Sequence, residues 1–330
     1  MDGTHVTLDP RASLLPAVLL ILMLAVVSLF VGVSDVSLAS LWRDGLDGHA
    51  MQVLLSSRLP RTLALILAGA GMAVAGLIMQ MLVRNRFVEP STVGTVESAS
   101  FGMLMVTLLA PDMPVVAKML VAAACALAGT MLFLQVLRAV PLRSVLMVPL
   151  IGILLSGIIG AVTTFFAYRF DLLQSLNAWT TGDFSIVLRG RYELLWISGV
   201  MAVVAYIAAD RFTVAGLGKD FATNLGVNHG RVVALGLVIV ALVSATVLVS
   251  VGMIPFLGLV VPNAVSLVAG DNVRRSLPLV ALLGAGLVVA CDIVGRLVIQ
   301  PYEIPIGATM GVIGSGCFLY MLLRSKARVA

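Results

Sequence analysis

Residues with the types and spacing that chemistry requires are scarce in this sequence. Lys219 follows Gly218 but precedes Asp220, so the pair does not belong to a phosphate-binding loop, in which Ser or Thr follows Gly-Lys. The histidines and cysteines have no partners at metal-ligand spacing. They are His5, His49, His229, Cys125, Cys291 and Cys317. The sequence therefore predicts no catalytic site, no metal site and no cofactor in this chain.

The longest polar interruption in the second half of the chain, residues 215–231, has the pattern of a short amphipathic helix. Asp220 would lie in its first turn, where the helix dipole favours an anion. Gly226 would end the helix in a left-handed conformation. The apolar residues fall on one face at four-residue spacing: Leu217, Phe221 and Leu225. Such a helix between membrane spans is a candidate contact with another protein, and an ordinary polar loop is the alternative.

The composition of the chain indicates an all-α membrane protein. Of its 330 residues, 60% are hydrophobic and 11% are charged, and the mean hydropathy is +1.11. Apolar runs of about 20 residues suit helices that cross a bilayer and are too long for barrel strands. The net charge of +5 comes from bases scattered through the loops, which argues against nucleic-acid binding.

The apolar runs predict about ten transmembrane helices in a single membrane domain, residues 1–330. The predicted spans are 14–33, 59–83, 93–110, 115–137, 145–168, 193–209, 232–251, 254–269, 277–298 and 306–323. An even number of spans places both termini on one side. More Lys and Arg lie in the loops of that side, which predicts that both termini are cytoplasmic. The polar segment 210–231 is then a cytoplasmic loop within the domain.

A few charged residues lie at or inside predicted spans, where charge is costly. Arg58 and Arg61 are three residues apart at an outer span end and share a helix face. Arg296 also lies at an outer end, one turn after Asp292. These arginines could reach lipid headgroups. Glu97 lies just inside the third span, where it could accept a hydrogen bond from a neighbouring helix or contact a substrate.

A faint internal repeat links two spans. Residues 59–71 and 277–286 both have Leu-Pro followed by Gly-Ala-Gly. The two helices would run in opposite directions, as inverted repeats of transporters do, although chance could also produce this pattern.

Five blocks in the same order resemble the FecCD-type permeases, which import vitamin B12, haem and ferric siderophores. The blocks are RLPR at 58–61 with RNRFVEP at 84–90, WTTG at 179–182, GMIPFLGLVVPN at 252–263, DIVGR at 292–296 and EIPIG at 303–307. The segment from Gly218 to Val227 is similar to the cytoplasmic coupling loop of that family.

This resemblance implies a type II ABC importer permease in the cytoplasmic (inner) membrane, moving an iron chelate inward while ATP is hydrolysed on a separate subunit. It implies ATPase subunits, a second permease chain, a periplasmic or surface-tethered siderophore-binding protein and membrane lipid as partners.

The resemblance also assigns roles to residues of this chain. Coupling to the ATPase would involve Gly218, Phe221, Ala222, Leu225 and Gly226. Glutamates on the two lobes of the binding protein would meet Arg58, Arg61 and Arg296. The turns that narrow the cytoplasmic exit, forming a gate, would include Asn85, Phe87 and Ser144.

The sequence departs from the family pattern at three positions. Arg86 replaces the usual Pro, Asn263 the usual His, and Glu97 a small polar residue. The Glu97 variant resembles the petrobactin- and anguibactin-type permeases, which favours an iron chelate over vitamin B12. A vitamin B12 or haem permease, an ion-coupled secondary transporter without an ATPase, and a membrane scaffold are the alternatives. Which siderophore is carried, and whether the two permease chains are identical, stay open.

Overall fold

The computed structural model describes residues 10–32, 48–140, 146–188, 190, 192–270, 272–299 and 301–326. Within these ranges the regular structure is helical, with no strand, which confirms the predicted all-α class. The first half contains α1 (Pro10–Phe30), α3 (His49–Val53), the π-helix η1 (Leu54–Arg58), α4 (Leu59–Val83), the 3-10 helix η2 (Pro90–Thr92), α5 (Thr95–Leu109), α6 (Val115–Ala139) and α7 (Met147–Arg169). The second half contains α8 (Leu173–Thr180), α9 (Leu195–Ile207), α10 (Ala209–Gly216), α11 (Lys219–Asn224), α12 (His229–Val251), α13 (Leu257–Ala269), α14 (Val273–Val298) and α15 (Ile306–Lys326).

Each of the ten predicted apolar segments forms a helix, but the helices differ in length. Five of the described helices are long and apolar enough to cross a membrane, and a sixth span results if α9 and α10, bent by 66°, count as one. The remaining apolar helices are shorter. α5, with 15 residues, rises about 22 Å, less than the roughly 30 Å of a bilayer core. The backbone before α5 and α13 must therefore enter the membrane depth inside the protein, as in the broken helices of transporters.

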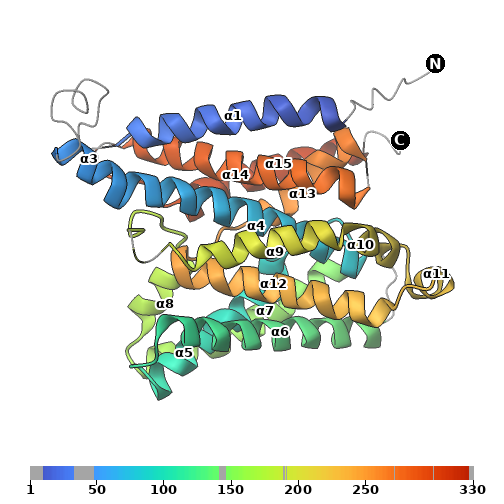
Figure 1. The fold of residues 1–330 in the computed structure, drawn as a ribbon. Helices are drawn as coiled ribbons and strands as arrows, with labels where there is room; N and C mark the ends of the chain where they lie inside the picture. The colour runs from blue at the N-terminus through green and yellow to red at the C-terminus, as the bar shows by residue number, and fades with distance from the viewer. Residues whose placement is uncertain are drawn as a thin grey trace.

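Helix α4 is the centre of the bundle. Most of its residues are buried, and it packs against α14, α9, α13 and α12. α4 and α14 run antiparallel (Figure 1). Gly69 and Gly284 face each other at their crossing, where a Cβ on Gly69 would lie 2.7 Å from the carbonyl oxygen of Gly284. The two Gly-Ala-Gly segments of the faint repeat thus pack directly against each other, because small residues let helices approach closely.

Three of the sequence blocks meet near the C-terminal end of α12. The amide of Gly307 donates to the carbonyl of Gly182 at 3.0 Å, and the amide of Asp183 donates to the carbonyl of Val251 at 2.8 Å. The blocks at 179–182, 252–263 and 303–307 therefore form one packed junction.

Several predicted boundaries were wrong. The second span begins earlier than residue 59, because α3 and η1 continue into α4. Part of the preceding loop, residues 33–47, lies outside the described residues. The segment 169–192 contains α8, which was not predicted. The segment 210–231 contains the predicted short helix, α11, and also most of α10, which was not predicted. α8 and α10 were missed because the polar residues of a short amphipathic helix give the same low local hydropathy as a loop.

The arrangement of the ends agrees with the predicted topology. α1 begins and α15 ends at the end of the bundle where α10 and α11 lie, on the right of Figure 1. The opposite end carries α3 and α8. We call these the cytoplasmic end and the outer end, following the predicted topology.

Candidate functional site

At the outer end, five charged side chains from distant parts of the sequence form one cluster. The members of this outer cluster are Arg58, Arg61, Asp292, Arg296 and Glu303. Arg61 lies between two acids, with Nη2 2.6 Å from Asp292 Oδ1 and Nη1 2.7 Å from Glu303 Oε2. Arg296 Nη2 lies 2.5 Å from the other oxygen of Asp292. These ion pairs connect α4, α14 and the segment before α15.

The outer cluster also holds the end of α1. Arg296 donates to the carbonyl and hydroxyl oxygens of Ser28 at 3.0 and 2.6 Å. Arg58 donates to the carbonyl of Val31. Arg296 is 3% exposed and Arg58 is 7% exposed, so neither reaches headgroups or presents a free guanidinium at the surface of this chain. Arg61 is partly exposed, with 12% of its side chain accessible. Contact of the three arginines with the binding protein stays a prediction.

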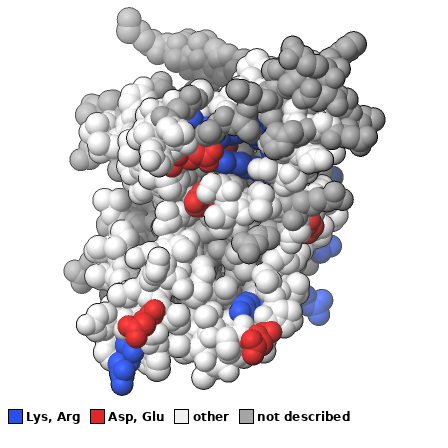
Figure 2. Space-filling model, turned by 90° about the vertical axis from the view of Figure 1, so that its left-hand side faces the viewer, with Lys and Arg blue, Asp and Glu red and all other residues white. Residues whose placement is uncertain are grey.

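Among the described residues, the outer cluster contains three arginines and two acids. Figure 2 shows the outer end, where acidic and basic side chains gather in small patches on a largely uncharged face. Glu303 is the most exposed acid of the cluster, with 26% of its side chain accessible.

At the cytoplasmic end, α11 has the predicted form. Gly218 is its N-cap and Asp220 lies in its first turn. Gly226, with φ of 73°, takes the left-handed conformation expected after the helix. Phe221 and Leu225 are 52% and 58% exposed, so they form an apolar surface that the chain leaves uncovered.

Ala222 does not belong to this exposed surface. Its side chain is fully buried, and α11 packs against α10 and α12. The expectation that Ala222 enters a groove on the ATPase is therefore corrected. Successive side chains of a helix point in directions that differ by about 100° around the helix axis. Ala222 therefore lies on the inner face of α11, although the preceding residue, Phe221, is exposed.

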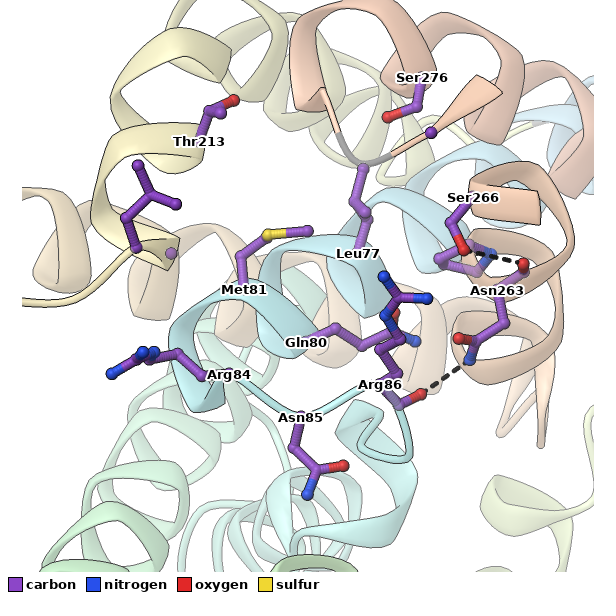
Figure 3. Close-up of a pocket in the computed structure, with 14 residues that line it drawn as sticks. Leu77, Gln80, Met81, Arg84, Asn85, Arg86, Thr213, Asn263, Ser266 and Ser276 are labelled. Carbon is purple, nitrogen blue, oxygen red and sulfur yellow. Dashed lines mark hydrogen bonds between the residues drawn. The ribbon is translucent and has the colours of Figure 1, made fainter. Parts of the chain in front are cut away.

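The gate turn, residues 84–90, follows α4 and borders a cavity of about 340 Å³. Figure 3 shows Arg84, Asn85 and Arg86 on one side of this cavity, with Thr213 of α10 and Asn263 of α13 on other sides. Asn85 is buried, and its Oδ1 accepts a hydrogen bond from the amide of Phe87 at 2.8 Å. The predicted gate residues Asn85 and Phe87 thus lie together at the cytoplasmic end. Ser144 lies outside the described residues.

Glu89, a residue to which no role was assigned from sequence, fastens the gate turn to α13. Its Oε1 accepts hydrogen bonds from Ser91 Oγ at 2.5 Å and from the amide of Phe256 at 2.9 Å. Burial raises the pKa of the Glu89 carboxyl, and these hydrogen bonds oppose that shift. Phe256 precedes α13, so the carboxylate lies at the positive end of a helix dipole. The sequence signal that could have identified Glu89 is its position as the acidic residue within the block at 84–90.

The α13 start is also tied to α4. Gln80 Nε2 donates to the carbonyl of Gly258 at 3.1 Å, and Asn263 Nδ2 donates to the carbonyl of Arg86 at 2.7 Å. Asn263, the residue that replaces the usual His, therefore holds the backbone of the gate turn.

Glu97 lies in the first turn of α5. Its Oε2 and the hydroxyl of Ser156 on α7 are both buried, and neither has a hydrogen-bond partner among the described residues. Ser156 nevertheless interacts with the Glu97 carboxyl, so the neighbouring helix α7 supplies the hydroxyl that the expected hydrogen bond requires.

Several of the described helices expose long apolar faces, α7 and α15 among them. Exposed apolar side chains of α7 include Leu150, Ile153, Leu154, Ile158 and Phe165, and those of α15 include Val312, Leu319 and Tyr320. Gly157 on α7 and Gly316 on α15 have no atoms of this chain near the position of a Cβ. These glycines are therefore not required for packing within the chain.

A metal site is not evident in the part of the chain that the structure describes, where no three His, Cys, Asp or Glu side chains group together. Cys125, Cys291 and Cys317 are free thiols.

Comparison with known proteins gives a consistent result. The petrobactin import system permease protein YclN of Bacillus subtilis (strain 168) is 47% identical over 309 residues, which cover 94% of this chain and 97% of that protein. The ferric-anguibactin transport system permease protein FatD of Vibrio anguillarum is 38% identical over 91% of this chain and 95% of its own length. A solved inward-facing conformation of a putative metal-chelate type ABC transporter has a TM-score of 0.79 and 24% identity, covering 95% of this chain and 99% of that chain.

The fold therefore matches an ABC transporter permease. The family model of the FecCD transport family matches residues 19–324, nearly the whole of the sequence. This chain belongs to the FecCD transport family.

Proposed function

We propose that this chain is the permease subunit of an ATP-binding-cassette importer that carries a ferric siderophore across the cytoplasmic membrane into the cell. The observation that carries this proposal is the 47% identity, over almost the full length of both chains, to a petrobactin import permease. The 38% identical relative is a ferric-anguibactin permease, so both are named for siderophores. The class of cargo is therefore an iron chelate rather than vitamin B12.

ATP hydrolysis belongs to a separate subunit, and α11 is its docking element. Phe221 and Leu225 are exposed at the tip of the cytoplasmic end, next to Leu217, which is 55% exposed. Burying such apolar side chains in a partner groove contributes about 1.5–3 kcal/mol each. Because Ala222 faces inward, the ATPase contact consists of these three larger side chains.

A second permease chain covers α7 and α15. In a membrane, exposed apolar side chains can face either lipid or another protein chain. Exposed glycines favour a protein neighbour, because they permit close approach of helices. Gly157 and Gly160 of α7 both have open space at the Cβ position, as do Gly311 and Gly316 of α15. The pathway for the chelate then runs between the two permease chains.

The outer cluster orients the siderophore-binding protein. Arg61 and Glu303 are its partly exposed members, with 12% and 26% of their side chains accessible, so they are the part of the cluster that a charged side chain of the partner can reach. Arg58 and Arg296 contribute by holding α1 and α14 in place beneath this surface. Since exposed ion pairs contribute about 0–1 kcal/mol each, the cluster sets encounter rate and orientation more than affinity.

The cytoplasmic gate comprises the gate turn with Asn85 and Phe87, together with the turn that contains Ser144. Glu97, in the first turn of α5, serves as an intramembrane polar site behind α7.

Co-purification and uptake test this proposal together. The tagged chain, extracted from native membranes, should bring down an ATPase and a second permease chain. Iron uptake from a ferric siderophore should stop when the Walker A lysine of that ATPase is substituted. Uptake that persists without ATP hydrolysis would instead support the ion-coupled transporter.

A further inference from the structure

The gate turn has a shape that its own hydrogen bonds fix. The amide of Asn85 donates to the carbonyl of Gln80 at 3.0 Å, and the amide of Phe87 donates to Asn85 Oδ1 at 2.8 Å. The amide of Glu89 donates to Thr92 Oγ1 at 3.1 Å. One of these bonds lies within the turn, and the other two tie its two ends to α4 and to η2, so the turn is held at both ends.

The cytoplasmic side of the gate turn touches the loop that carries α11. A Cβ on Gly218 would lie 3.2 Å from Arg84 Nη1, so the Arg84 guanidinium packs against the backbone at the start of α11. Similarly, a Cβ on Gly216 at the end of α10 would lie 3.2 Å from Met81 Sδ on α4. Any displacement of α11 toward or away from the membrane therefore acts on the start of the gate turn.

The other side of the gate turn holds α13. Glu89 Oε1 accepts from the amide of Phe256 at 2.9 Å, and the carbonyl of Arg86 accepts from Asn263 Nδ2 at 2.7 Å. The two contacts engage the beginning and the middle of α13, so this helix cannot rotate independently of the turn.

Both the gate turn and the start of α13 contact α15. The rings of Phe87 and Phe318 are 5.9 Å apart in an edge-to-face arrangement. Phe256 packs on Gly314, where an added Cβ would lie 2.5 Å from Phe256 Cβ. α15 also exposes a long apolar face, and among the described residues its main contacts are with α14 and α13.

We propose that the gate turn is a rigid link that carries displacement of α11 to α15, with Glu89 as the positioning residue that couples the turn to α13. The cavity between α4, α10, α13 and α14 borders the gate turn and gives it room to move. This inference rests on the proposed function, because it assigns the route by which ATPase docking at α11 changes the pathway helix.

The ratio of chelate transported to ATP hydrolysed tests the link. The complete complex, reconstituted in liposomes with its binding protein, is compared between the wild-type chain and Glu89→Leu, which removes the acceptor of the Ser91 and Phe256 hydrogen bonds. Glu193→Leu is the control, because Glu193 also accepts a backbone hydrogen bond, from Gly190, but lies outside the link. We expect the transport ratio to fall about tenfold in Glu89→Leu, within the range of allosteric couplings, and to stay unchanged in Glu193→Leu. ATPase binding should not change in either variant.

A spin label at Tyr320 on α15 gives a second readout; this residue is 63% exposed in the single chain and would face the second permease chain in the complex. In the wild-type complex the label should change its mobility when ATP binds, and in Glu89→Leu this change should be lost. A Glu89→Leu complex with normal transport ratio and normal label response would overturn the link. Absence of transport in the wild-type complex would instead count against the proposed function.

Discussion

Arg61 and Asp292 are 231 positions apart in the sequence, yet Arg61 Nη2 lies 2.6 Å from Asp292 Oδ1. This contact joins α4 to α14, the two helices that also meet through Gly69 and Gly284. Asp292 is 1% exposed and shares its second oxygen with Arg296. The pair therefore has two consequences, one for stability and one for docking.

Replacing Asp292 with Asn should strongly destabilise the protein. The substitution leaves Arg296 buried without a counter-charge, and breaking a buried pair on one side costs about 3–5 kcal/mol. Thermal unfolding in detergent should show a large loss of stability for Asp292→Asn and a small one for Glu303→Gln, because Glu303 is partly exposed and Arg61 keeps Asp292. Equal losses would show that the cluster is not organised around Asp292.

Replacing Glu303 with Gln should accelerate docking of the binding protein. The substitution removes a partly exposed negative charge and leaves Arg61 Nη1 available to a carboxylate of the partner. We expect association to be up to about fivefold faster at low salt, with a steeper dependence on ionic strength. Stopped-flow association rates measure this effect, and a slower or salt-independent association would refute docking at the outer cluster.

The exposed face of α11 gives a third prediction. Phe221→Ala and Leu225→Ala should each weaken ATPase binding by more than about 1 kcal/mol, because they remove exposed apolar side chains expected at the interface. Thr223→Ala is the matched control on the same helix. Binding of the purified ATPase to the permease in nanodiscs measures the difference.

Ala222→Asp should behave differently from these variants. The carboxylate would be buried against α10 and α12, so we expect displacement of α11 and reduced thermal stability even without the ATPase. Unchanged stability of Ala222→Asp alone, with lost ATPase binding, would restore Ala222 to the interface.

The glycines of α7 distinguish packing within the chain from packing between chains. A Cβ on Gly152 would lie 2.3 Å from the carbonyl oxygen of Thr92, whereas a Cβ on Gly157 meets nothing within 4 Å. Gly157→Leu should therefore preserve the folded monomer and reduce the fraction of permease dimer, while Gly152→Leu should impair folding. Native mass spectrometry reports the dimer fraction. A Gly157→Leu protein with undiminished dimer would place the interface elsewhere.

Much of the fold could be predicted from the sequence because membrane burial imposes a strong local signal. Each of the ten apolar runs is a helix, and both Gly226 and the start of α11 have the predicted conformation. Helix lengths were less predictable. The start of the second span at α3 and the bend between α9 and α10 depend on neighbouring helices rather than on local composition.

The sites show the same division. The types and positions of Arg58, Arg61 and Arg296 identified the outer end, but their burial could not be foreseen, because it depends on Asp292, Glu303 and the end of α1. Glu89 escaped notice because its partner, the amide of Phe256, is a backbone group 167 positions away. Side-chain direction on a helix as short as α11 was also uncertain, which explains the misplacement of Ala222.

The most direct test of the proposed function is transport by the reconstituted importer. Liposomes that contain this chain, its partner permease and the ATPase receive a ferric siderophore of the petrobactin or anguibactin type with the binding protein outside. The proposal predicts accumulation of iron inside the liposomes that requires ATP, the ATPase and the binding protein together. Accumulation driven by an ion gradient without ATP, or complete absence of accumulation with every subunit present, would contradict it.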